Sequence, residues 1–298
     1  MTVIKKLIYT SALLTGLAVS LTSCDIAPDD RFILEDKVVP QRNVLLMDFT
    51  GQGCLNCPNA HDAMSELSAQ YNTDGDTHLI TVSIHAGAQA VPVNRTDFSK
   101  NRIGLMIAEG QEMNDAFSIN AWPTGTVDHI NGRDNTLLYS EWPGAVRSAF
   151  EKPTDIRIDA EATLVDDNIE VSTQVHSTAD QDVALQVWVI ENGIKASQRM
   201  PDGNYDQEYT HNHVLRFVQY PVKTGKPMQL KEGVIASDQC EIPLKWTDKE
   251  RWNRDNLQVV VFAFRGSDIL NCTITTPLSI PCLLYTSDAG DDLIGVDL

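Results

Sequence analysis

Basic residues are scarce in this chain of 298 residues, which has 23 Lys and Arg against 41 Asp and Glu. The formal net charge of −18 gives the protein no attraction for phosphate, and this disfavours nucleic acid as a partner. The sequence has no internal repeat and no low-complexity tract, and hydrophobic residues make up an ordinary 42%. This composition excludes collagen-like, disordered and multi-pass membrane proteins, and the length fits two globular domains.

An apolar stretch near the N-terminus, Leu7–Leu21, contains no acidic residue and follows two lysines. It is too short and wrongly flanked for a membrane-spanning helix, so residues 1–23 are predicted to be a secretory signal peptide. The sequence Leu-Thr-Ser-Cys that follows resembles a bacterial lipobox, which implies that Cys24 is lipidated and becomes the first mature residue. Residues 24–42 are then the lipidated cysteine and a polar tether. The alternative is a plain signal peptide with a chance cysteine nearby.

The last segment of the sequence, residues 282–298, is CLLYTSDAGDDLIGVDL. It resembles the translation of a transposon-end sequencing adapter, and we expect it to be a non-native tail. The alternative is a genuine polar tail after a final strand. Under the first interpretation, Cys282 does not count among the cysteines of the protein.

Residues 43–151 alternate between strand-like and helix-like patterns. Runs of apolar and β-branched residues predict strands, and apolar residues at helical spacing predict helices. The predicted order is strand 43–49, helix 58–71, strand 78–85, helix 103–117, strand 124–130 and helix 141–150. Ser140 is the predicted cap of the last helix. This order is typical of an α/β domain of about a hundred residues.

The pattern changes at residue 152. Apolar residues then alternate with polar ones in short runs separated by turn residues, at 156–164, 169–175, 183–189 and 257–261. Closely spaced alternating strands without helical periodicity indicate a sandwich of two β-sheets. We therefore predict that residues 152–281 form an all-β, immunoglobulin-like sandwich domain.

A Cys-x-x-Cys sequence, Cys54 to Cys57, lies between the first predicted strand and the first predicted helix. A cysteine at a helix N-terminus faces unpaired N–H groups that stabilise its thiolate, and a second cysteine three residues on can close a disulfide. Pro58 is tolerated in the first helical turn, and it excludes covalent haem attachment, which needs a histidine there. The alternative is a structural disulfide, although so short a loop gains little stability from closure.

Three separated features resemble the thioredoxin superfamily. Asp48-Phe49 precedes Cys54 and Cys57 at that family's spacing, and Trp122-Pro123-Thr124 stands where the family has a cis-proline loop. The resemblance implies that Cys54 forms a mixed disulfide with a partner, Cys57 resolves it and Asp48 accepts the proton. It also implies that Pro123 holds the partner backbone, with Trp122 and Thr124 beside the substrate.

A narrower resemblance covers nearly the whole mature chain. The sequences VLLMDFTGQGCLNCPNAH, VSIHAG, WPTGTVDH and EYTHNHVLR are similar to a family of outer-membrane lipoproteins of anaerobic Gram-negative bacteria, known as 28-kilodalton outer-membrane proteins. That family pairs a thioredoxin-like domain with a β-sandwich. The resemblance implies a lipid-anchored protein of the bacterial outer membrane, facing the periplasm or the cell surface.

Several further residues have two interpretations each. His61, one helical turn after Cys57, and His85, at a strand end, are candidate metal ligands, but the CxxC spacing differs from the CxxxC of copper-binding relatives of thioredoxin. We therefore predict no metal and no cofactor. His211 and His213 fit a solvated edge strand better than a metal site. Cys240 and Cys272 are candidates for a structural disulfide in an exported protein.

The predicted function is that of an envelope-anchored thiol–disulfide oxidoreductase acting on protein thiols or disulfides, with the sandwich as a partner-binding or spacing element. The alternative is a non-catalytic outer-membrane lipoprotein that binds a protein or glycan partner. In that case the thioredoxin-like domain is only a scaffold, because a fold does not establish an activity.

Overall fold

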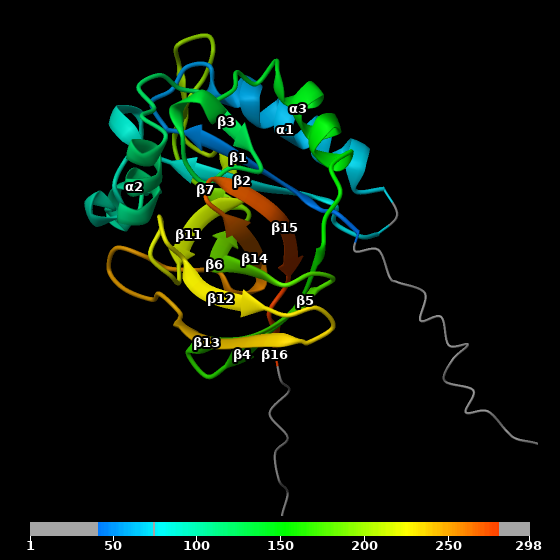
Figure 1. The fold of residues 1–298 in the computed structure, drawn as a ribbon. Helices are drawn as coiled ribbons and strands as arrows, with labels where there is room; N and C mark the ends of the chain where they lie inside the picture. The colour runs from blue at the N-terminus through cyan, green and yellow to red at the C-terminus, as the bar shows by residue number, and fades with distance from the viewer. Residues whose placement is uncertain (1–40, 74, 280–298) are drawn as a thin grey trace, which may run out of the picture. The chain divides into compact units, whose positions relative to one another are not determined.

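A computed structural model describes residues 41–73 and 75–279, which form a mixed α/β fold with more strand than helix (Figure 1). The helices are α1 (Cys57–Tyr71), α2 (Ala108–Ala116) and α3 (Trp142–Phe150). The strands are β1 (Val44–Thr50), β2 (Leu79–His85), β3 (Thr124–Val127), β4 (Ile156–Val165), β5 (Asn168–Ser177), β6 (Gln181–Glu191), β7 (Ile194–Lys195), β8 (Gln198–Arg199), β9 (Tyr205–Asp206), β10 (Thr210–His211), β11 (Val214–Val218), β12 (Lys226–Leu230), β13 (Ala236–Pro243), β14 (Leu257–Arg265), β15 (Asp268–Thr275) and β16 (Leu278–Ser279).

Strands β1 and β2 pair in parallel, and β3 adds to β1 in the antiparallel sense. Every residue of β1 and β2 is buried, which explains their nearly continuous apolar sequences. Helices α1 and α3 cover one face through a core that includes Leu46, Met64 and Trp142. The predicted strands and helices of this part are present, with boundaries that differ by a few residues.

Two local predictions were wrong. The helix expected over residues 103–117 begins only at Ala108, because the preceding segment forms a bridge in which Met106 N–H and Leu105 N–H both donate to Val91 O. The residue that caps α3 is Glu141 rather than Ser140, and it makes no side-chain capping bond. Both errors concern helix ends, where contacts outside the helix decide the boundary.

An eight-stranded sheet has the order β15-β14-β6-β11-β2-β1-β3, with β12 also paired to β6. Strand β11 lies between the two parts of the chain: it is antiparallel to β6 and parallel to β2, where Val214 pairs with Ser83. Ser83 N–H also donates to His213 O at 2.8 Å. Strands from both sides of residue 152 therefore share one sheet, and the division into two domains at that residue stays a prediction.

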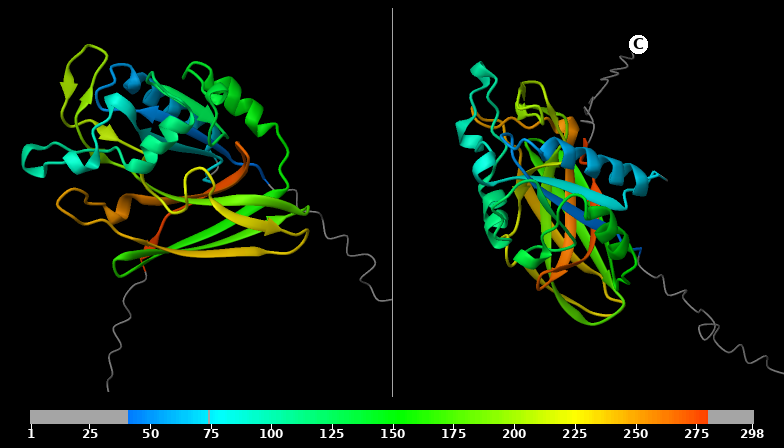
Figure 2. Two further views of the ribbon diagram at one scale, coloured as in Figure 1. Left: turned by 60° about the vertical axis from the view of Figure 1, so that its left-hand side comes forward. Right: turned by 90° about the horizontal axis from the view of Figure 1, so that it is seen from above.

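A second sheet, β13-β5-β4-β16, packs against the β6 and β14 part of the large sheet. The alternating residues face this core, for example Ile169 and Val171 of β5 opposite Val187 and Val259 of the large sheet. Figure 2 shows this small sheet as the layer farthest from α1 and α3. The alternation in the sequence thus predicted which residues are buried between the two sheets.

The other face of the large sheet surrounds a different core. Phe49 of β1 packs edge-on against Phe117 at 5.3 Å, and Trp188 of β6 packs against Phe262 of β14 at 4.7 Å between ring centroids. All four side chains belong to one buried cluster, together with Met113 of α2. The large sheet therefore curves around this core, and α2 closes it (Figure 1).

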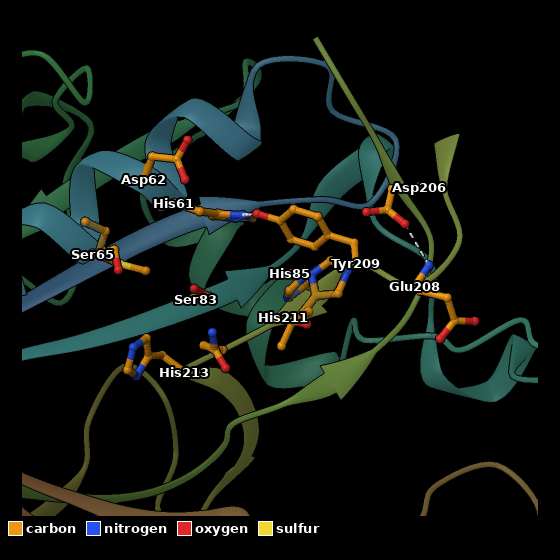
Figure 3. A pocket seen from close by; sticks show the side chains of 13 residues that line it. His61, Asp62, Ser65, Ser83, His85, Asp206, Glu208, Tyr209, His211 and His213 are labelled. Carbon is orange, nitrogen blue, oxygen red and sulfur yellow. Dashed lines mark hydrogen bonds between the residues drawn. The ribbon is translucent and has the colours of Figure 1, made fainter. Parts of the chain in front are cut away.

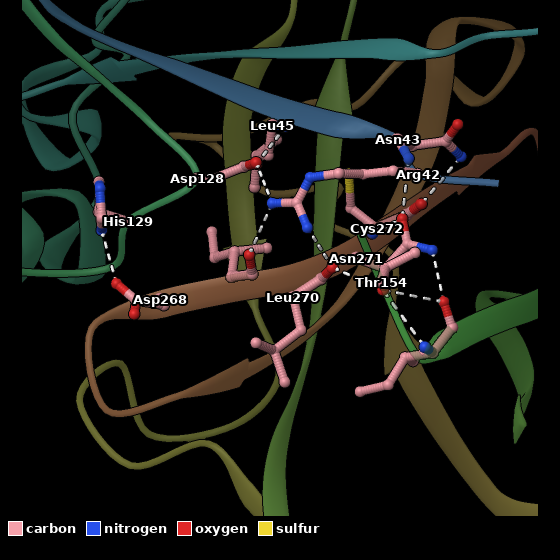
Figure 4. A network of polar contacts seen from close by, with 12 residues as sticks. Arg42, Asn43, Leu45, Asp128, His129, Thr154, Asp268, Leu270, Asn271 and Cys272 are labelled. Atoms are coloured by element: carbon pink, nitrogen blue, oxygen red, sulfur yellow. Dashed lines mark hydrogen bonds and ion pairs between the residues drawn. The ribbon is translucent and has the colours of Figure 1, made fainter. Parts of the chain in front are cut away.

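Arg42 ties the beginning of the described chain to β15 (Figure 4). Its guanidinium donates to Asp128 Oδ2 at 2.6 Å and to Leu270 O at 2.9 Å, while Asp128 Oδ1 accepts from Leu45 N–H at 2.8 Å. Asn271 Oδ1 accepts from Asn43 N–H at 2.9 Å. Arg42, the last residue of the predicted tether, is thus part of the folded protein.

The predicted signal peptide, the lipidation site Cys24 and the adapter-like tail lie outside the described residues. Within the described ranges, no helix is long and apolar enough to cross a membrane.

Candidate functional site

Cys54 and Cys57 form a disulfide at the start of α1. Cys57 is the first helical residue and Pro58 follows it within the first turn, where a missing N–H costs no helical hydrogen bond. The loop before the helix is held by Gly53 N–H donating to Gln89 O and by Cys54 N–H donating to Gly51 O. The cysteine pair is therefore placed as the sequence predicted, between a buried strand and a helix N-terminus.

The disulfide is enclosed by a distant part of the chain. Only 4% of Cys54 and none of Cys57 is exposed. The side-chain amide of Gln198, from β8, donates to Cys54 O at 2.9 Å, and Arg199 N–H donates to Gln52 O at 2.8 Å. Strand β8 thus covers the loop that carries the cysteines.

Asp48 is fully buried in β1, on the strand face opposite that of its neighbours Met47 and Phe49. Burial raises the pKa of its carboxyl to about 8, because a carboxylate loses its hydration there. Neither carboxyl oxygen makes a hydrogen bond within the described residues, and Oδ2 lies 3.4 Å from His61 Nε2. Asp48 is therefore a buried acid that carries a proton at neutral pH.

His61 joins this acid to a tyrosine of the other part of the chain. Its Nε2 lies 3.0 Å from Thr50 Oγ1, and its Nδ1 lies 2.9 Å from the hydroxyl of Tyr209 (Figure 3). Burial lowers the pKa of His61 to about 4 and raises that of Tyr209 to about 12, so both side chains are neutral at pH 7.

The Trp122–Pro123 peptide bond is cis, as the resemblance implied. Thr124, the first residue of β3, pairs with Phe49 of β1, so Pro123 lies at the end of the sheet where β1 leads into the cysteine loop. The Trp122 ring is half-buried and lies against Gly87, where an added Cβ would stand 1.9 Å from the ring. The roles of Trp122 and Thr124 in substrate binding stay predictions.

Three further histidines line a cavity of about 370 Å³ beside His61. His85 ends β2, His211 belongs to the short strand β10, and His213 precedes β11. The prediction that His211 lies on a solvated edge strand is wrong, because only 2% of this residue is exposed. The side chains of Tyr209, His61 and His85 pack around its ring. Over residues 41–73 and 75–279, no group of three His, Cys, Asp or Glu side chains is arranged to hold a metal ion.

The disulfide considered for Cys240 and Cys272 is not formed, and both thiols are free. Cys240 lies on β13 of the small sheet, whereas Cys272 lies on β15 and packs in the core on the other side of the large sheet. The two residues therefore belong to different layers.

Sequence reasoning missed two residues of this site, Gln198 and Tyr209, and it did not predict that His211 is buried. Tyr209 and His211 stand in the sequence EYTHNHVLR, where aromatic and histidine residues crowd a short segment, and this was the available signal. The sequence around Gln198 gives no such signal, because this residue belongs to the site only through its hydrogen bond to Cys54, which is 144 residues away in the sequence.

Comparison with known proteins gives a family and a fold. HBP35 of Porphyromonas gingivalis has a similar fold over 87% of this chain and 81% of its own, with a TM-score of 0.61 at 15% identity. A domain of the outer membrane lipoprotein Omp28 from the same organism matches 43% of this chain and 92% of its own, with a TM-score of 0.31 at 14% identity, too low to compare folds. No curated protein matches the chain.

Residues 110–275, more than half of the chain, match the family Outer membrane protein Omp28. This match confirms the family to which the narrower resemblance pointed and the predicted location at the outer membrane. The chain belongs to the Omp28 family.

Proposed function

We propose that this protein is a non-catalytic, lipid-anchored protein of the outer membrane that binds a protein or glycan partner, with its N-terminal part as a scaffold. The observation that carries the proposal is the burial of the Cys54–Cys57 disulfide, in a loop whose main chain is bound by Gln198 and Arg199. Thiol–disulfide exchange needs in-line access of a thiolate to one sulfur. A cystine with almost no exposed surface acts instead as a fixed part of the fold.

An exposed aromatic side chain in the β-rich part of the chain supports this proposal. Trp246 is 75% exposed, at a cavity of about 510 Å³ whose lining also includes Arg251 and Asn253. The Arg251 guanidinium is held in place, 4.3 Å from the centre of the Phe98 ring and 5.7 Å from that of Trp246. Large exposed aromatic rings with planar polar side chains beside them are typical of binding surfaces.

Binding of the purified full chain to immobilised envelope glycans and envelope proteins tests the proposal. We expect Trp246→Ala to weaken binding at least tenfold, and the double variant Cys54→Ser/Cys57→Ser to bind as the wild type does. Leu138→Ala, at an exposed apolar residue in the N-terminal part, is the matched control. Binding that is lost with the cysteines and kept without Trp246 would contradict the proposal.

A second candidate is thiol–disulfide exchange, favoured by one arrangement. The cystine at the start of α1, the buried acid Asp48 and the cis Trp122–Pro123 bond gather at one end of the sheet, in a pattern that resembles the thioredoxin superfamily. In this mechanism a partner dithiol reduces Cys54–Cys57 to two thiols and leaves as a disulfide, which conserves two electrons and two protons.

Equilibrium redox titration separates the two candidates. A potential between about −270 and −120 mV, with preferential alkylation of Cys54, would support exchange. A potential below about −300 mV is expected of a structural cystine and would support the non-catalytic function.

A further inference from the structure

Two buried histidines in the cavity of Figure 3 have ring nitrogens without a side-chain partner among the described residues. Both nitrogens of His85 and both of His211 make no hydrogen bond of ordinary geometry in the described part of the chain. Each residue is only 2% exposed. A buried imidazole without partners is costly, so two adjacent ones indicate a site for a ligand that accepts their lone pairs.

The spacing of the two rings fits one metal ion. Their centroids lie 5.2 Å apart with an angle of 65° between the ring planes. With metal–nitrogen bonds of about 2.1 Å, two imidazoles on a tetrahedral ion have centroids on the order of 5 Å apart. The distance between the two rings is therefore the one expected of two imidazoles that share an ion.

The charge of the surroundings suits a cation. Both rings are buried, and an imidazole nitrogen that carries no proton donates its lone pair to a metal ion. Arg216, whose positive charge acts on His85, is paired with Glu191 at 3.2 Å and with Glu250 at 3.6 Å.

The cavity is also lined by three acidic residues at its entrance and by two further histidines. Asp62, Asp206 and Glu208 line it from exposed positions, and their carboxylates favour entry of a cation. His61 is already engaged with Thr50 and Tyr209, and in Figure 3 His213 lies apart from the other rings.

We propose that His85 and His211 bind one late first-row divalent metal ion, such as Zn²⁺ or Cu²⁺, through one imidazole nitrogen each. Water completes the coordination from the cavity side, because the described side chains offer no third ligand in place. The backbone at Ala196 and Ser197, which favours the protonated form of His211, lies where it can orient that ring.

Calorimetric titration of the full chain, free of any histidine tag, with Zn²⁺ tests the site. We expect one ion per chain, and at least tenfold weaker binding after His211→Gln or His85→Gln, because even the loss of an outer-shell partner commonly costs that much. His213→Gln, in the same cavity but away from the pair, should bind Zn²⁺ like the wild type. Absence of binding, or binding unchanged in His211→Gln, would overturn the proposal.

His85 and His211 are buried, so a substitution at either position can prevent folding. Zn²⁺ binding by such a variant could then not be compared with binding by the wild type. Electron paramagnetic resonance of the wild type with one equivalent of Cu²⁺ then decides. Hyperfine coupling to two imidazole nitrogens is the expected spectrum. A spectrum with oxygen ligands alone, or with more than two imidazoles, would overturn the two-histidine site.

Discussion

The side-chain amide of Gln198 donates a hydrogen bond of 2.9 Å to the carbonyl oxygen of Cys54, across 144 residues of sequence. Gln198 is completely buried, and Cys54 nearly so. Arg199 N–H also donates to Gln52 O, so β8 is fixed to the main chain of the cysteine loop at two points. The contact of Gln198 with Cys54 therefore connects the cysteine loop of the N-terminal part to strand β8 of the β-rich part.

Gln198→Ala should make the Cys54–Cys57 disulfide easier to reduce. The substitution removes a hydrogen bond worth about 1 kcal/mol, so we expect roughly fivefold faster reduction by dithiothreitol. Quenched alkylation followed by mass spectrometry measures the rate. Arg199→Ala is the control, since Arg199 uses its main-chain N–H, which alanine keeps. Equal rates for Gln198→Ala and the wild type would show that β8 does not protect the cystine.

Asp48→Asn should stabilise the protein increasingly as the pH rises. The folded pKa of Asp48 is about 8 and the unfolded value is near 4, so between these values only the folded state holds the proton. The free energy of unfolding of the wild type then falls with rising pH, by about 1.4 kcal/mol per unit for this one group.

Urea unfolding between pH 5 and pH 9 measures this effect. The advantage of Asp48→Asn should grow up to about pH 8 and then stay constant. Asp62→Asn, at an exposed position of α1, controls for loss of a surface charge. A constant difference between Asp48→Asn and the wild type across this range would mean that Asp48 is ionised in the folded protein.

Acid should destabilise the protein through its buried histidines. The pKa of His211 is about 3 in the folded protein and near 6.5 when unfolded, so below pH 6.5 the unfolded chain binds a proton that the folded one does not. The free energy of unfolding contributed by this group therefore falls as the pH drops from 6.5 toward 3.

His211→Gln should reduce the stability lost between pH 7 and pH 5 by about 2 kcal/mol. The measurement is urea unfolding at both pH values with a chelator present, which separates proton binding from metal binding. His176→Gln, on β5 in the small sheet, is the control. If His211→Gln and the wild type lose equal stability, His211 does not resist protonation in the folded state.

Arg42→Met should destabilise the protein by about 3 kcal/mol, because it leaves the buried carboxyl of Asp128 without its ion pair. Burial already raises the pKa of Asp128, and Arg42 opposes that shift. The double variant Arg42→Met/Asp128→Asn should lose less stability than the sum of the single variants. Thermal unfolding of the four proteins gives the coupling, and strict additivity would argue against the pair.

Local pattern in the sequence was sufficient for much of the fold. Apolar runs predicted β1 and β2, alternation predicted β4, β5, β6 and β14, and helical spacing with Pro58 in the first turn predicted α1. These elements follow from side-chain periodicity and from backbone preferences of single residues. The same local order placed Cys54 and Cys57 at a helix start.

Local sequence patterns could not predict the contacts between segments that are far apart in the chain. Pairing of β11 with β2, which merges both parts of the chain into one sheet, depends on main-chain hydrogen bonds that any residue can make. Burial of His211 likewise depends on Tyr209, His61 and His85 meeting around it.

The amino-acid sequence by itself determined the order of strands and helices, the acidic charge, the cysteine pair and the membership of an outer-membrane family. Only the tertiary structure decided how much of the cystine is exposed, because exposure depends on every segment that packs around it. It also decided which histidines are buried and neutral, since desolvation is set by all the elements that surround a side chain.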